Sequence, residues 1–165
     1  MSQYQLVQLN IAKMKEPLES PSMADFVANL GRINTLAEQS AGFVWRLKDD
    51  SGNAAAMRPF GDDIIVNMSM WKDVASLSNY AFKSGHVDIM RRRREWFERM
   101  AEAYAVLWWV PRNHIPSVIE ARERLEHLRQ FGATPHAFTF KDAFPAPDAH
   151  NAAQVLTSND ACPAT

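Results

Sequence analysis

Residues 84–111 read SGHVDIMRRRREWFERMAEAYAVLWWVP, and this stretch joins a charged segment to an apolar one. His86 opens the charged segment, which contains a run of four arginines. The segment 104–110 is apolar on both faces, which is typical of a strand at the buried centre of a sheet. The stretch therefore predicts a helix over 86–100 that leads into a central strand.

The four arginines, Arg91 to Arg94, cannot all lie on one face of a helix, because successive positions turn by ~100°. Arg93 follows His86 by about two helical turns, so these two side chains can lie on one stripe. The other arginines are expected to face solvent or to pair with glutamates, for example Arg94 with Glu98 at i,i+4 spacing.

Alternating and helical patterns predict the elements that precede this stretch. Strands are predicted over 4–12, 43–47 and 64–70, and helices over 22–39 and 72–82. The first helix can begin with Ser22 as its cap, or it can have Pro21 as its first residue behind Ser20.

The residues that follow the stretch predict one more helix and an irregular end. Ser117 and Glu120 have the spacing of a capping box, and Gly132 can terminate the helix that begins there. A short last strand is predicted over 137–140. From there on Pro, Ala, Asp and Asn dominate, so a flexible tail is predicted over 142–165.

The predicted order is strand, helix, strand, strand, helix, strand and a C-terminal helix. This order is typical of α+β proteins with a ferredoxin-like split βαβ arrangement, in which helices cover one face of an antiparallel sheet. A chain of 165 residues suits one domain, which we expect over 1–141.

Large apolar side chains occur on both faces of the predicted sheet, whereas the main helices of this arrangement cover only one. Trp45, Trp71 and one of the pair Trp108 and Trp109 therefore need a lid or a partner. A second copy of the sheet would supply that cover and would enclose a cavity. We therefore expect a homodimer formed through the sheet face.

Composition and charge exclude several classes of protein. The formal net charge is −1, so the arginine run has no wider basic surface to support nucleic-acid binding. The sequence has no apolar run near the ~20 residues that cross a bilayer, and it opens without a signal-peptide pattern. A single cysteine, Cys162, excludes an intrachain disulfide framework and fits a reducing compartment, so a cytoplasmic location is expected. The sequence also lacks metal-ligand spacings, and His127 and His136 have no partner at such a spacing.

Three blocks of the sequence resemble one family. They read LVQLNIAKMKEPLESPSMADFVANLGRINTLAEQSAGFVWRL at 6–47, YAFKSGHVDIMRRRREWFE at 80–98 and WWVPRNHIPSVIEARERLEHLRQFGATPHAFTF at 108–140. Over about residues 3–141 the sequence resembles the DUF3291 family, a branch of the dimeric α/β-barrel superfamily. That superfamily includes antibiotic-biosynthesis monooxygenases, haem-degrading monooxygenases and stress-responsive barrel proteins. The resemblance implies a homodimer with a small-molecule cavity in each half, and it does not single out a reaction.

His86, Asn10 and Arg93 are the predicted catalytic residues. A histidine near a helix start can act as a general base, and burial would keep it neutral; the alternative is that it caps or packs there. Asn10 alternates onto the same strand face as Leu6 and Gln8, the face assigned to the cavity. An arginine such as Arg93 could hold a substrate carboxylate or a dimer partner.

Six further residues are predicted to bind the substrate: Trp45, Asn67, Trp71, Tyr80, Trp108 and His114. The tryptophans would form an apolar wall, and Asn67 would orient a polar atom. His114 follows the central strand and would reach the mouth of the cavity, or would cap at the surface.

The leading hypothesis is a monooxygenase-like oxidoreductase without a cofactor, acting on an apolar or aromatic small molecule. Two alternatives stay open: a haem-binding protein that uses His86, and a non-catalytic ligand-binding or stress-associated dimer. In haem-degrading relatives a strand Asn, a Trp and a helical His form the site. The resemblance sets Asn10 at the first position and Tyr80 at the second, and it sets Met90 near the third, one turn after His86.

Overall fold

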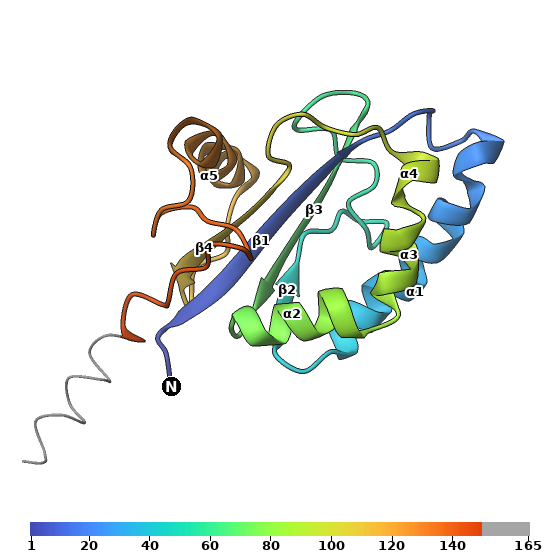
Figure 1. Ribbon diagram of the computed structural model, residues 1–165. Coiled ribbons are helices and arrows are strands. Elements are labelled where there is room, and N and C mark those ends of the chain that lie inside the picture. Colours follow the sequence, from blue (N-terminus) through green and yellow to red (C-terminus); the bar gives the residue numbers. More distant parts are fainter. Residues whose placement is uncertain (150–165) are drawn as a thin grey trace, which may run out of the picture.

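The computed structural model describes residues 1–149, and at their centre is a four-stranded antiparallel sheet in the order β2-β3-β1-β4 (Figure 1). The strands are β1 (Tyr4–Lys13), β2 (Phe43–Arg46), β3 (Ile64–Trp71) and β4 (Ala105–Pro111). Each lies within about one residue of its predicted boundaries, because alternation of apolar and polar side chains marks strands directly.

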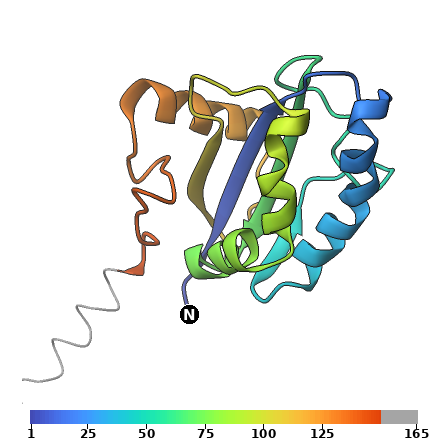
Figure 2. The ribbon, with the colours of Figure 1, turned by 45° about the vertical axis from the view of Figure 1, so that its right-hand side comes forward.

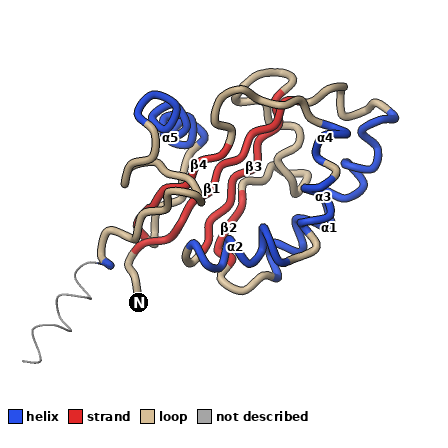
Figure 3. Tube along the Cα trace, in the orientation of Figure 1, coloured by secondary structure: helices blue, strands red, loops and turns tan. Residues whose placement is uncertain are grey.

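Helices lie against both faces of the sheet (Figures 1 and 2). They are the 3-10 turn η1 (Pro21–Met23), α1 (Ala24–Gln39), α2 (Val74–Lys83), α3 (His86–Arg91), α4 (Arg93–Trp96) and α5 (Val118–Phe131). The first five cover one face, and α5 lies on the other. Figure 3 shows this arrangement, with the helices in blue on either side of the red strands. The order β1-α1-β2-β3-α2-β4 with this strand order confirms the predicted α+β, ferredoxin-like fold class.

Alternation along β1 gives the two faces of the sheet different chemistry. Leu9 pairs with Met68 of β3 and with Val106 of β4, and all three are fully buried in the core on the α5 side. Asn10 pairs with Asn67 and points to the face that α1 and α3 cover. The sheet therefore has one face that is mainly apolar and one face that carries the Asn10–Asn67 amides.

The face opposite α1–α4 is covered by the chain itself. Trp108 is fully buried there, in one cluster with Leu125 of α5, and its Nε1 donates to Glu120 at 2.9 Å. Trp45 packs against the same cluster, as does Phe60 from the connection between β2 and β3. Of the two predicted kinds of cover, a lid or a partner, the structure shows a lid from the same chain, so these tryptophans do not require a second copy of the sheet. The homodimer itself stays a prediction.

The helix predicted over 86–100 is shorter and is broken at Arg92, between α3 and α4. Phe97 then turns extended and forms a bridge with Met14, and its ring lies edge-on to Phe26 at 5.0 Å. Phe97 is buried in this position, and burying an aromatic ring stabilises more than one further helical turn would.

The early end of α4 changes the ion pairs that helical spacing predicts. Glu98 lies beyond the helix, so it pairs with Lys13 at 3.2 Å rather than with Arg94. The predicted Arg94–Glu98 pair is therefore wrong. Arg94 is exposed on the outer side of α4.

Local chemistry sets several boundaries of the elements. Pro21 is the first residue of η1 behind Ser20, one of the two predicted starts. The Asp73 side chain caps α2 by accepting from the Ser76 amide at 2.8 Å, so α2 begins after residue 72. Gly42 before β2 has φ 85°, and a Cβ there would collide with the Ser76 side chain.

The strand predicted over 137–140 is reduced to two isolated bridges, one between Phe138 and Leu107 of β4 and one between Ala137 and Thr134. Phe138 is fully buried, so the packing of this side chain holds the segment in place more than backbone hydrogen bonds between strands do. No helix in the described part of the chain combines the length and the hydrophobicity that a membrane crossing requires.

The chain after α5 returns along β4 and is held by specific contacts. Trp109 Nε1 donates to the Phe144 carbonyl at 2.9 Å, and Asp148 accepts from Ser2 Oγ at 2.7 Å. These contacts lie in the first part of the predicted tail. Residues 150–165 of that prediction, with the only cysteine, lie outside the described residues.

Candidate functional site

A cavity of about 140 Å³ lies between the sheet and the helices that cover its amide-bearing face. Its floor is formed by the cross-strand pairs Asn10–Asn67 and Ala12–Ile65. Its walls come from α1, α3 and the residues that follow α3, and they include Phe26, Leu30, Ile33, Asn34, His86, Ile89, Met90, Arg93 and Phe97. The cavity thus lies between sheet and helices, where the sequence predicts it.

Asn10 and Asn67 lie directly opposite each other on β1 and β3. Neither side-chain amide has a hydrogen-bond partner within residues 1–149. Asn10 is half-buried and Asn67 is exposed to the cavity side. Because each amide offers two donors and an acceptor, the pair can bind a polar atom of a ligand that rests on the sheet.

His86 begins α3 and lines the cavity with a half-buried imidazole. Its Nδ1 lies 3.4 Å from the carbonyl oxygen of Ala81. We assign the imidazole proton to Nδ1, which can then donate to this carbonyl, so Nε2 keeps a free lone pair. Burial lowers the pKa of His86 below its ordinary 6.5, although the Ala81 carbonyl opposes the shift. The imidazole is therefore neutral at pH 7 and can accept a proton.

Arg93 begins α4 and lines the same cavity, although helices α3 and α4 are separate. Its guanidinium lies 4.2 Å from the centre of the Tyr104 ring, within the range of a cation–π contact. Within residues 1–149 no carboxylate lies within 4.0 Å of this guanidinium. The cavity therefore contains a cationic group with no acidic partner in the described part of the chain.

The predicted wall of tryptophans is wrong, because none of the three lines the cavity. Trp71 is on the correct face but at the other end of the sheet, opposite Leu6, and it is fully buried. Trp45 and Trp108 belong to the core on the α5 side. Alternation predicts which side chains share a face, but not which part of that face stays open.

Tyr80 lies one layer behind the cavity. Its ring stacks on Trp71 at 5.0 Å and contacts the His86 ring at 4.9 Å. Its hydroxyl donates to the Ile33 carbonyl at 3.4 Å, and burial raises the pKa of Tyr80 to about 12. Tyr80 therefore orients the His86 imidazole and does not itself line the cavity.

His114 does not reach the cavity. It follows Pro111, which pairs with Tyr4, whereas Asn10 pairs with Ala105 at the other end of β4. At ~3.3 Å per strand residue these two ends are ~20 Å apart. The His114 imidazole instead pairs with a glutamate of α5.

Sequence reasoning missed Asn34 of α1, which lines the cavity and has no hydrogen-bond partner within residues 1–149. A signal for it exists. Phe26, Leu30 and Asn34 recur at intervals of four, so the amide continues the apolar stripe of α1 that faces the sheet. A polar residue in such a stripe indicates a site or an internal hydrogen bond.

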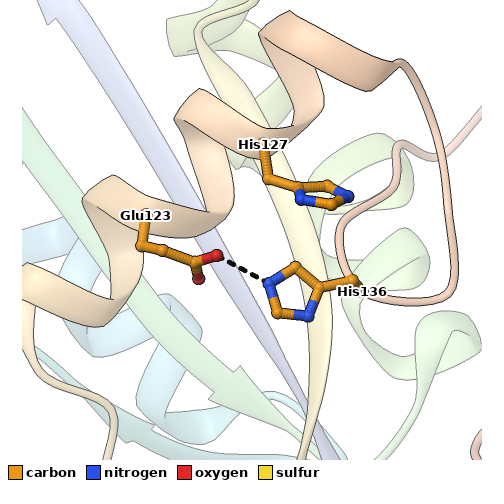
Figure 4. A group of neighbouring side chains, drawn as sticks. All are labelled: Glu123, His127 and His136. Carbon is orange, nitrogen blue, oxygen red and sulfur yellow. Dashed lines mark hydrogen bonds and ion pairs between the residues drawn. The ribbon is translucent and has the colours of Figure 1, made fainter.

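A second group of side chains lies on α5 and the turn after it (Figure 4). Potential ligand atoms of Glu123, His127 and His136 lie within 4.8 Å of one another, so the expectation that the two histidines lack partners is wrong. His136 contacts Glu123 through Nε2 at 2.8 Å and Arg124 through Nδ1 at 2.7 Å, and His127 contacts Thr134 at 3.1 Å. Both His136 nitrogens are engaged and a guanidinium lies beside them, which opposes a bound cation. The group fastens α5 to the turn that follows it.

Solved structures similar in chain course have low sequence identity. SnoaB, a cofactor-independent oxygenase from Streptomyces nogalater, matches with a TM-score of 0.44 and 16% identity, over 68% of this chain and 98% of that one. A dabb family protein with a ferredoxin-like fold from Mesorhizobium loti matches with a TM-score of 0.40 and 14% identity, over 68% and 98% of the two chains.

A protein of unknown function from Nitrosomonas europaea, NE2512, matches with a TM-score of 0.43 and 14% identity, over 70% of this chain and 95% of that one. No curated protein matches the sequence. The family model described as "Domain of unknown function (DUF3291)" matches residues 5–154, which is most of the chain. The protein therefore belongs to the DUF3291 family.

Proposed function

We propose that the protein binds a small, largely apolar or aromatic molecule in the cavity between the sheet and helices α1 and α3. One observation carries the proposal: unpartnered amides, a neutral imidazole and an arginine converge on a cavity whose other lining is mainly apolar. A mainly apolar cavity with a few convergent polar groups is typical of small-molecule sites.

The size of the cavity limits the ligand. A cavity of about 140 Å³ is close to the ~150 Å³ that accommodates benzene in an engineered protein core. One aromatic ring with a polar substituent therefore fits, with the substituent toward the polar residues. A haem macrocycle is several times larger than this volume, so the size of the cavity favours a single-ring ligand over the haem alternative with His86 as ligand.

We propose further that His86 acts as a base toward a phenolic or similarly acidic substrate. Its Nε2 would take the proton, and the resulting electron-rich anion would react with O₂. One oxygen atom is added to the substrate, and the other leaves as water with two substrate hydrogens. The reaction of phenol with O₂ to give 1,4-benzoquinone and water has this balance, and the substrate supplies all four electrons.

Binding and chemistry are tested separately. Chemical-shift titration with single-ring aromatic probes should perturb cavity residues, and Asn67→Ala should lower affinity by the ~0.5–1.5 kcal/mol of one hydrogen bond. Oxygen uptake with a panel of phenols should then fall by about 10²-fold or more in His86→Gln, while binding persists. Binding without uptake for any phenol would support the non-catalytic ligand-binding alternative. Absence of any binding would contradict the proposal as a whole.

We also propose that the protein is a homodimer. Because α5 covers the sheet face, the partner would contact the outer surface of α5, where Ile119 is 81% exposed, and the loop before α5, where Ile115 is 56% exposed. Exposed apolar side chains of this size, close together in sequence, are typical of an interface.

A further inference from the structure

We infer that the natural ligand of the cavity carries a carboxylate and that Arg93 binds it. The inference rests on the proposed small-molecule binding and names the class of ligand: a compact aromatic acid. The chemistry of the arginine run and the absence of acidic groups in the cavity lining carry it.

The four arginines of the run have different surroundings, and only Arg93 lines the cavity. Arg92 is engaged by Asp25 at 2.9 Å and by Glu95 at 2.9 Å. Arg91 lies 3.9 Å from an aspartate on the exposed side of α3, and Arg94 is exposed. Arg93 thus faces the cavity, while its neighbours in the run face solvent or pair with acids.

Within residues 1–149, the lining of the cavity contains no aspartate and no glutamate. It contains one other arginine, Arg46, whose Nε is paired with Glu38 at 2.8 Å and whose Nη2 donates to the Gly52 carbonyl at 2.6 Å. Arg46 is therefore already neutralised. Within the described residues, the charge of Arg93 is the one in this cavity that an incoming ligand can balance.

The environment of Arg93 suits a carboxylate in particular. The guanidinium is half-buried, and one of its flat faces is covered by the Tyr104 ring at 4.2 Å. Its edge carries the N–H groups that bind both oxygens of a carboxylate at once. A half-buried charge gains more from such a partner than an exposed one, because less water competes for it.

The rest of the cavity suits an aromatic ring attached to that carboxylate. Leu30, Ile89 and Met90 present apolar surface beside Arg93, and the volume of about 140 Å³ allows about one ring. A phosphate would demand more donors than one free arginine supplies. A single-ring acid satisfies both the charge and the size of the site.

Benzoate and benzamide test the inference, because they share a ring and a planar head group and differ in charge. Isothermal titration calorimetry or NMR chemical-shift titration at pH 7 should show that the wild-type protein binds benzoate about tenfold or more tightly than benzamide. Arg93→Met should abolish that preference. Arg93→Lys should keep part of it, because the charge remains while the two-pronged contact is lost.

Arg94→Met is the matched control. It removes the same charge from the adjacent position, outside the cavity, so the preference for benzoate should be unchanged. Equal binding of benzoate and benzamide by the wild type would overturn the inference and leave small-molecule binding intact. An equal loss in Arg93→Met and Arg94→Met would also overturn it, because the effect would then be general electrostatics. If neither probe binds, the proposed function fails with the inference.

Discussion

The His86 side chain makes the stability of the protein depend on pH. Burial lowers the pKa of its imidazole in the folded state below the 6.5 of the unfolded state. Between these two values the unfolded chain binds more protons, so stability rises with pH. The contribution of His86 is therefore complete above about pH 6.5 and is lost as the pH falls through the lower, folded value.

His86→Gln should remove this dependence, because a neutral amide does not titrate. We expect the free energy of unfolding of the wild type to fall more steeply than that of the variant as the pH is lowered from 7 to 5. Urea denaturation at several pH values measures it. All other residues are the same in the two proteins, so the difference isolates His86. If the free energy of unfolding depends on pH in the same way in both proteins, the His86 imidazole is not buried in the folded state.

Four of the nine predicted site residues lie at one cavity. The local regularity of strands and helices explains why the sequence predicts their positions. Strand alternation sets Asn10 on the amide-bearing face, and cross-strand pairing brings Asn67 opposite it. Trp45 and Trp108 could not be placed in this way. Their surroundings are decided by α5, whose docking face depends on long-range packing that local periodicity does not encode.

At the scale of elements, helix α5 decides which face of the sheet is closed. Leu125 is fully buried in the cluster that also contains Trp108. Leu125→Ala should destabilise the protein by ~2–5 kcal/mol, because it leaves a cavity in packed core. Gln130→Ala is the control on the exposed side of the same helix and should change stability by ~0.5 kcal/mol or less.

Chemical denaturation with circular dichroism measures both variants. Equal, small effects of the two substitutions would mean that α5 is not part of the folded core. The expected contrast would also show that the tryptophans on this face are covered within one chain.

The elements that the sequence predicts best are those fixed by local chemistry. The Asp73 cap and the bend at Gly42 are set by neighbouring residues, so the boundaries near them follow from pattern and turn chemistry. The helix predicted over 86–100 fails for the opposite reason. Phe97 leaves the helix to pack against Phe26, a residue about seventy positions earlier, and such a contact is not visible in local spacing.

At the scale of the whole molecule, covering the sheet with α5 moves any dimer interface outward. A chain of 18.7 kDa should therefore be found at twice that mass, held by the outer surface of α5. Ile119 is 81% exposed and Ile115, four residues earlier, is 56% exposed, so the two offer apolar surface that a partner can cover. Ile119→Glu should return the protein to 18.7 kDa, because a charge is poorly tolerated at the centre of an interface.

Light scattering over a range of protein concentrations measures the mass, and circular dichroism checks that the variant is folded. Val27→Glu is a matched control, because it places the same charge at an exposed apolar position of α1, on the other face of the sheet. A wild type that stays at 18.7 kDa at every concentration would contradict the dimer. A dimer that persists in Ile119→Glu would place the interface elsewhere. The proposed interface on α5 lies on the opposite face of the sheet from the cavity. Ligand binding should therefore survive the loss of the dimer.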